Sequence, residues 1–209
     1  MNSNGFSEAQ SYFQSKDRVL FNASKRAVRA DYPIVVPTAK GPDEYFSTLV
    51  YSIVSQQIST KVARVLYARL AEHFGTITPH KLSIAADTDL RSVGLSGQKV
   101  RYIKTLAQHW NTINVSKLST ASDVEITEQL TRFPGIGIWT AEMFLLFALA
   151  RPDVFSIGDV GLCKACADLY GLHANDKTEI QRLSQTWAPY RSYAALVLWH
   201  QLDGSPVLL

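Results

Sequence analysis

The amino-acid sequence predicts an almost entirely α-helical protein. Apolar residues recur at intervals of three and four, the spacing of one helix face, in several segments. The segment after Gly41 carries this pattern at Phe46, Leu49, Val50, Ile53 and Val54. No stretch alternates apolar and polar residues as a half-buried strand does, and the apolar triplet 34–36 is too short for a sheet. With 209 residues, 46% of them hydrophobic, the chain can bury a core as one domain or two joined lobes.

Nine or ten helices are expected. Ser59 precedes an apolar-periodic segment, where a side-chain cap belongs, and Asp159 has the same place before the segment 160–170. Pro189 fits the first turn of a last helix that ends near Gln201. The expected helices are 7–30, a helix opened by Gly41-Pro42-Asp43, one from Ser59 to about Phe74, 87–92, 97–110, 123–131, one from about Ile138, 160–170, and the last helix.

Composition and charge limit the class of protein. A formal net charge of +3 is too small to demonstrate nucleic-acid binding. No apolar run reaches the roughly 18 residues of a membrane span, so no membrane association is expected. The N-terminus lacks a basic-then-apolar signal, and we therefore expect a cytoplasmic, nucleoid-associated protein, or a nuclear one in a eukaryote.

The two cysteines, Cys163 and Cys166, are expected to fill the core. A zinc or iron–sulfur site needs about four ligands, and the chain has no other cysteine. The five histidines show no spacing typical of a metal site. We therefore expect no iron–sulfur cluster and no cofactor for catalysis.

A turn with two glycines interrupts two expected helices. Pro134 cannot continue the first helix, and Gly135 and Gly137 can adopt positive φ or let another backbone approach closely. Amides that enter the second helix are then uncovered, and such amides bind phosphate well. From these residues alone, an ordinary connection between two helices is an equal alternative.

Asp159 directly precedes a predicted helix. An aspartate in this place is most often an N-cap, whose side chain accepts hydrogen bonds from backbone amides. The same amides and the helix dipole keep the carboxylate ionised, so capping is compatible with a role in chemistry.

The segment Phe133-Pro134-Gly135-Ile136-Gly137-Ile138-Trp139-Thr140-Ala141 resembles the helix-hairpin-helix of base-excision DNA glycosylases. In that family the essential aspartate lies about twenty residues after the hairpin, where Asp159 stands here. The run from Trp187 to Trp199 resembles the alkylated-base branch, the 3-methyladenine DNA glycosylase II type. The similarity covers about residues 43–202.

The resemblance implies a two-lobed all-α fold with the active site in the cleft between the lobes. Residues 43–145 would form the central lobe, which carries the hairpin at about 130–149. Residues 1–42 and 146–209 would form the second lobe, which carries Asp159.

The resemblance also assigns roles in catalysis. Asp159 would stabilise the positive charge that develops on the sugar and orient the attacking water. Trp139 stands where glycosylases that also cut the backbone have a lysine, so no Schiff base is expected. Trp139 and Trp199 would stack on an electron-poor alkylated purine. Met143 and Val160 take the places of pocket tyrosines found in some relatives.

On the DNA side, Gln57 aligns with the side chain that the family inserts into the duplex when the target base is flipped, and its neighbour Ile58 is also expected to contact DNA. The hairpin residues expected to contact DNA are Pro134, Gly135, Ile136, Gly137 and Thr140. The backbone carbonyls of Thr131, Phe133 and Gly135 match the family's site for a monovalent cation, Na⁺ or K⁺.

The function predicted in this way is hydrolytic removal of alkylated purines, such as 3-methyladenine and 7-methylguanine, from double-stranded DNA by a monomeric, monofunctional enzyme. A glycosylase for other damaged or mismatched bases is one alternative. A non-catalytic helix-hairpin-helix DNA-binding module is another, although it leaves Asp159 and the two tryptophans unexplained.

Overall fold

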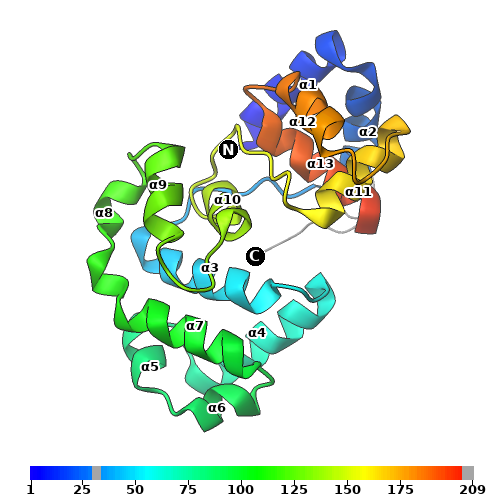
Figure 1. The fold of residues 1–209 in the computed structure, drawn as a ribbon. Coiled ribbons are helices and arrows are strands. Elements are labelled where there is room, and N and C mark those ends of the chain that lie inside the picture. Colours follow the sequence, from blue (N-terminus) through cyan, green and yellow to red (C-terminus); the bar gives the residue numbers. More distant parts are fainter. Residues whose placement is uncertain (30–33, 204–209) are drawn as a thin grey trace. The chain divides into compact units, whose positions relative to one another are not determined.

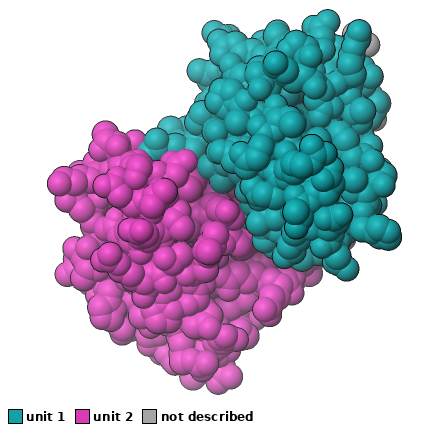
Figure 2. Space-filling view, turned by 45° about the horizontal axis from the view of Figure 1, so that its top comes forward, with its two compact units in different colours: residues 1–39, 149–209 teal, residues 40–148 magenta. Residues whose placement is uncertain are grey.

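The computed structural model describes residues 1–29 and 34–203, and in these ranges it is built from helices, without strands (Figure 1). The all-α prediction is therefore confirmed. The chain divides into two compact units. Unit 1 comprises residues 1–39 and 149–209, and unit 2 comprises residues 40–148 (Figure 2).

Unit 2 is organised around one helix, α3 (Pro42–Ser55), that is largely buried after its first turn. Its elements are α3, α4 (Thr60–Phe74), α5 (Pro79–Ile84), α6 (Asp87–Ser92), α7 (Gly97–Gln108), a 3₁₀ turn η1 (Trp110–Thr112), α8 (Val115–Leu118), α9 (Asp123–Leu130) and α10 (Ile138–Phe147). Helix α3 contacts α4, α7 and α10, and its residues from Tyr45 to Val54 are buried except for Ser47. Helix α10 is apolar almost all round, and every residue from Met143 to Phe147 is buried.

Unit 1 has a similar plan. It contains α1 (Ser3–Lys16), α2 (Arg18–Arg29), α11 (Val160–Tyr170), α12 (Lys177–Gln185) and α13 (Arg191–Asp203). Helix α13 contacts both α2 and α11, and every residue from Ser192 to His200 is buried. Cys163 and Cys166 of α11 are buried as predicted, and burial raises the pKa of Cys166 to about 12. None of the helices in the described ranges is long and apolar enough to cross a membrane.

Some predicted boundaries were wrong. The single helix expected over 7–30 is two helices within its described part, because the chain breaks at Asp17, which ends α1 and accepts a hydrogen bond from Leu20 N at 2.9 Å. Pro189 lies ahead of α13 instead of in its first turn. The described residues form thirteen α-helices, where nine or ten were expected. The unpredicted ones are α5, α8 and α12, which are short or mostly polar and show little apolar periodicity.

The break at Asp17 is held by a partly buried hydrogen-bond cluster in unit 1. Asp17 Oδ2 accepts from the hydroxyl of Tyr170 at 2.6 Å and from the indole N–H of Trp187 at 2.8 Å. Trp187 is fully buried. Burial, followed by the hydrogen bond to Asp17, raises the pKa of Tyr170 far above its usual value. One carboxylate thus joins the α1–α2 corner to α11 and to the segment before α13.

We expect Asp17→Ala to lower the free energy of unfolding by about 3 kcal/mol, because it removes a helix cap and leaves the buried indole of Trp187 and the half-buried hydroxyl of Tyr170 without this acceptor. Urea denaturation measures this loss. The matched control is Asp168→Ala, which breaks the Lys164–Asp168 ion pair, where both side chains are 60% exposed. The control should cost less than about 1 kcal/mol. Equal losses in the two variants would contradict a structural role for the Asp17 cluster.

Candidate functional site

Asp159 is the N-cap of α11 in unit 1, as its position before an apolar segment predicts. Its Oδ1 accepts a hydrogen bond from Leu162 N at 2.6 Å, and its backbone carbonyl accepts from Cys163 N at 3.0 Å. The side chain is half-buried. The carboxylate lies at the positive end of the helix dipole. The structure therefore holds a partly accessible negative charge in a defined orientation.

A second donor holds the same oxygen. The indole N–H of Trp199, in α13, donates to Asp159 Oδ1 at 3.2 Å, and the Trp199 side chain is almost completely buried. Gly161 leaves room for this arrangement, since a Cβ there would lie 3.3 Å from Asp159 Oδ1. Sequence reasoning selected both Asp159 and Trp199 but missed the bond between them. Only the packing of α13 on α11 brings together residues that are 40 positions apart.

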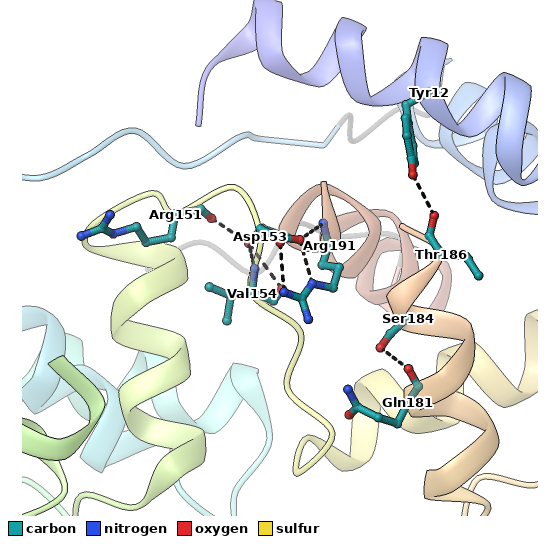
Figure 3. Close-up of polar contacts among 9 residues, drawn as sticks. Tyr12, Arg151, Asp153, Val154, Gln181, Ser184, Thr186 and Arg191 are labelled. Atoms are coloured by element: carbon teal, nitrogen blue, oxygen red, sulfur yellow. Dashed lines mark hydrogen bonds and ion pairs between the residues drawn. The ribbon is translucent and has the colours of Figure 1, made fainter. Parts of the chain in front are cut away.

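The segment that leads to Asp159 is fastened to the start of α13 (Figure 3). Arg191 donates to both carboxylate oxygens of Asp153, from Nε to Oδ1 at 2.7 Å and from Nη2 to Oδ2 at 2.9 Å. Ser192 Oγ donates to Arg151 O at 2.7 Å and accepts from Val154 N at 2.9 Å. These contacts fix the backbone ahead of Asp159 to the helix that carries Trp199. No local motif in the sequence indicates them.

In unit 2 the two hairpin glycines have different roles. Gly135 has φ +85°, the left-handed region that favours glycine, and an added Cβ would overlap the ring of Tyr102. Gly137 is the extended N-cap of α10, and an added Cβ would meet nothing within 4 Å. Pro134 and Gly137 are exposed at the turn. Ile136 and Thr140 are buried and anchor the turn in the interior of unit 2.

The other predicted residues of unit 2 lie at the end of α3 and along α10. Gln57 follows α3, is exposed, and has a φ of +59°, which is unusual for a residue other than glycine. Ile58 and Trp139 are half-exposed. Met143 is only 5% exposed, whereas Val160, in unit 1, is 83% exposed. The assignment of Met143 and Val160 to a base pocket stays a prediction.

Comparison with known proteins identifies the family. Residues 50–189 match the family model described as HhH-GPD superfamily base excision DNA repair protein. The chain belongs to this family. A solved structure of a DNA-3-methyladenine glycosidase from Bacillus halodurans is 34% identical, with a TM-score of 0.74, and the match covers 94% of this chain and 89% of that one.

Two further relatives also have names that describe 3-methyladenine DNA glycosylases. The Schizosaccharomyces pombe 3-methyladenine DNA glycosylase, solved in complex with abasic DNA, has a TM-score of 0.81 at 26% identity, covering 94% of this chain and 98% of that one. A putative DNA-3-methyladenine glycosylase of Bacillus subtilis is 28% identical over 76% of this chain, and the match spans 59% of that relative's length. The predicted family and the helix-hairpin-helix glycosylase fold are thus confirmed.

The two hairpin glycines of this HhH-GPD chain should differ in their importance for stability. We expect Gly135→Ala to lower the free energy of unfolding by at least about 2 kcal/mol, because it combines a left-handed φ with steric overlap. Gly137→Ala should change it by less than about 1 kcal/mol, since its backbone is extended and the space beside it is open. Urea denaturation of both variants measures the difference. A Gly135→Ala protein as stable as Gly137→Ala would contradict the geometry of the turn.

Proposed function

We propose that this protein is a base-excision glycosylase that hydrolyses the N-glycosidic bond of alkylated purines, such as 3-methyladenine and 7-methylguanine, in double-stranded DNA. The main support is the carboxylate of Asp159, held by Leu162 N and Trp199 Nε1 in a half-buried site. The relatives named 3-methyladenine DNA glycosylases support the same substrate class.

The proposed reaction breaks the bond between the sugar carbon C1′ and the purine nitrogen. The bonding electrons leave with the base, and positive charge develops on the sugar ring. The Asp159 carboxylate stabilises this charge and orients the water that adds to C1′ and loses one proton to the solvent. An alkylated purine is cationic and departs as a neutral base, so the reaction needs no general acid.

The proposed enzyme is monofunctional. The residue just after the hairpin is Trp139, flanked by Ile138 and Thr140, and none of these three side chains carries an amine. A Schiff base with the sugar requires an amine nucleophile. We therefore propose release of the free base with the DNA backbone left intact.

Unit 2 would bind the duplex through the hairpin and the end of α3. The exposed turn at Pro134 and Gly137 opens α10, whose N-terminus favours an anion such as a DNA phosphate. Gln57 would enter the base stack in place of the flipped nucleotide, because it is exposed on a short turn.

The carbonyl oxygens proposed to bind a monovalent cation are suitable ligands for Na⁺ or K⁺. Phe133 O accepts from Ile136 N at 3.0 Å, and Gly135 O accepts from Gln56 Nε2 at 2.7 Å. A carbonyl oxygen has two lone pairs, so each of these atoms retains one for a cation. Thr131, Phe133 and Gly135 would hold Na⁺ or K⁺, which would supply positive charge next to a DNA phosphate.

The decisive experiment incubates methylated duplex DNA with the protein and identifies the released bases. We expect free 3-methyladenine and 7-methylguanine, no strand scission, and no covalent complex after borohydride treatment. Release of mismatched or oxidised bases instead would redirect the proposal to another glycosylase class. A trapped complex would show that an amine elsewhere in the chain is the nucleophile.

Asp159→Asn should reduce excision by at least ~10²-fold, the order expected when a charge aimed at the transition state is lost. Asparagine is also an N-cap, and its amide oxygen can accept the same two hydrogen bonds, so the variant should fold and bind DNA. Single-turnover excision and a binding titration test the two statements separately. Near wild-type excision by a folded Asp159→Asn protein would exclude Asp159 as the catalytic residue.

Trp199→Phe should lower excision of cationic and neutral bases alike, by roughly tenfold, because it removes the N–H that orients the carboxylate but keeps an aromatic ring. Trp199→Ala should cost cationic bases more than neutral ones, since it also removes a cation–π contact. Excision of 7-methylguanine and of hypoxanthine by both variants gives the comparison. Unchanged activity in Trp199→Phe would mean that the hydrogen bond to Asp159 does not contribute.

A further inference from the structure

Lys99, in α7 of unit 2, reaches the end of α3. Its ammonium Nζ donates to Val54 O at 2.7 Å and to Gln56 O at 3.0 Å. The last carbonyls of a helix have no partner within the helix, and a cation there also complements the negative end of the helix dipole. Burial at this place lowers the pKa of Lys99 below its usual value. Lys99 is therefore a partly desolvated cation that binds carbonyl oxygens at the end of α3.

Gln56 extends the connection from the end of α3 to the hairpin. Its side-chain Nε2 donates to Gly135 O at 2.7 Å and to Thr140 Oγ1 at 3.1 Å. The amide orientation is set by chemistry, because a backbone carbonyl can only accept a hydrogen bond. Gly135 lies in the turn and Thr140 in the first turn of α10, so one side chain connects the end of α3 to both parts of the hairpin.

Gln57 stands next to this network in an unfavourable backbone conformation. Its φ of +59° lies in the left-handed region, which persists for a non-glycine residue only when the surroundings enforce it. The φ angle is the rotation about the bond that follows the 56–57 peptide group. Lys99 donates to the carbonyl of that peptide group, and the side chain of Gln56 is hydrogen-bonded to the hairpin. The two contacts thus fix the orientation of the peptide plane that precedes Gln57.

Helix α7 also holds the hairpin itself. Tyr102, one turn after Lys99 and on the same side of α7, packs against Gly135 so closely that no Cβ fits there. The Tyr102 hydroxyl accepts from Gln98 Nε2 at 2.5 Å. One helix therefore supports both the residue before Gln57 and the glycine of the turn.

We propose that Lys99 and Gln56 are positioning residues for base flipping, which hold Gln57 in its left-handed conformation at a fixed place relative to the phosphate-binding hairpin. The inference rests on the proposed function for the role of Gln57 as the inserted side chain. When the hairpin binds a phosphate, Gln57 is then already placed to enter the duplex. Pre-organisation of this kind lowers the entropy cost of reaching the flipped state without adding a contact to DNA.

The test compares Lys99→Met with the wild-type protein on two DNA substrates. In the first, 7-methylguanine is paired within a continuous duplex, and in the second it lies in a single-nucleotide bulge, where the base is already poorly stacked. We expect single-turnover excision from the duplex to fall by roughly tenfold, the order for one charged hydrogen bond, and excision from the bulge to fall by less than about threefold. Lys99→Arg, which retains a cationic donor, should recover most of the loss.

The matched control is Lys104→Met. Lys104 also lies in α7 and also donates to a backbone carbonyl, Ala85 O at 3.0 Å, as well as to Asp87 Oδ1 at 2.6 Å. The Lys104→Met substitution therefore removes the same charge and a similar hydrogen bond from the same helix, at a different place. Lys104→Met should excise from both substrates at the wild-type rate. A parallel loss in Lys99→Met and Lys104→Met would assign the effect to stability or net charge and overturn the proposal.

A double variant separates positioning from a general structural role. If Lys99 acts through Gln57, Lys99→Met combined with Gln57→Ala should be no slower on the duplex than Gln57→Ala alone. Additive losses, or equal losses of Lys99→Met on duplex and bulge, would overturn the inference. Thermal unfolding confirms that each variant is folded at the assay temperature.

A readout independent of excision keeps this inference separate from the proposed function. Duplex DNA with 2-aminopurine next to the lesion becomes fluorescent when stacking is lost. Wild-type protein should raise this fluorescence, and Lys99→Met should raise it less at saturating protein. If wild-type protein released no alkylated base but showed this difference, the substrate assignment would fail and the positioning role would stand. If it released the base and the variant matched wild type in both assays, only the positioning role would fail.

Discussion

The hydrogen bonds that hold Asp159 are the interaction on which the candidate chemistry depends. A carboxylate can stabilise charge in a transition state only if its place is set beforehand, because reorienting it during the reaction would consume the energy gained. Here the amide of Leu162 and the indole of Trp199 converge on one oxygen. The Arg191–Asp153 fork and Ser192 then hold the preceding segment to the helix that carries Trp199.

Unit 1 contains two aspartates with the same local signature and different surroundings. Asp17 and Asp159 each cap a helix, and each accepts from a tryptophan indole. At Asp17 the hydroxyl of Tyr170 also binds, beside a fully buried Trp187, so the carboxylate joins elements of the fold. Asp159 is half-buried, at the start of a helix whose first residue, Val160, is 83% exposed. The capping pattern alone does not distinguish a structural carboxylate from a candidate catalytic one.

In unit 2 the helix that contacts both the hairpin and the end of α3 is one that sequence motifs do not single out. The hairpin and the end of α3 carry the residues with recognisable patterns, yet both are positioned by α7 through Lys99 and Tyr102. Gly135 illustrates the distinction. A glycine is required at position 135 both for the left-handed turn and for the close approach of the Tyr102 ring. Gly137 has an extended backbone and open space beside it, so it leaves the start of α10 accessible.

The sequence by itself determined the helical class, the helix start at Asp159, the hairpin turn and the family. These features rest on local periodicity, on capping and turn residues, and on a motif contiguous in the chain. The sequence did not determine the break at Asp17, because the apolar stripe continues across it and the partners Tyr170 and Trp187 are distant in the chain. It likewise did not determine the bond from Trp199 to Asp159 or those from Lys99 and Gln56 to the α3 end and the hairpin. Those contacts join residues far apart in sequence, and a hydrogen bond between them exists only once helix packing has set the distance and direction between donor and acceptor.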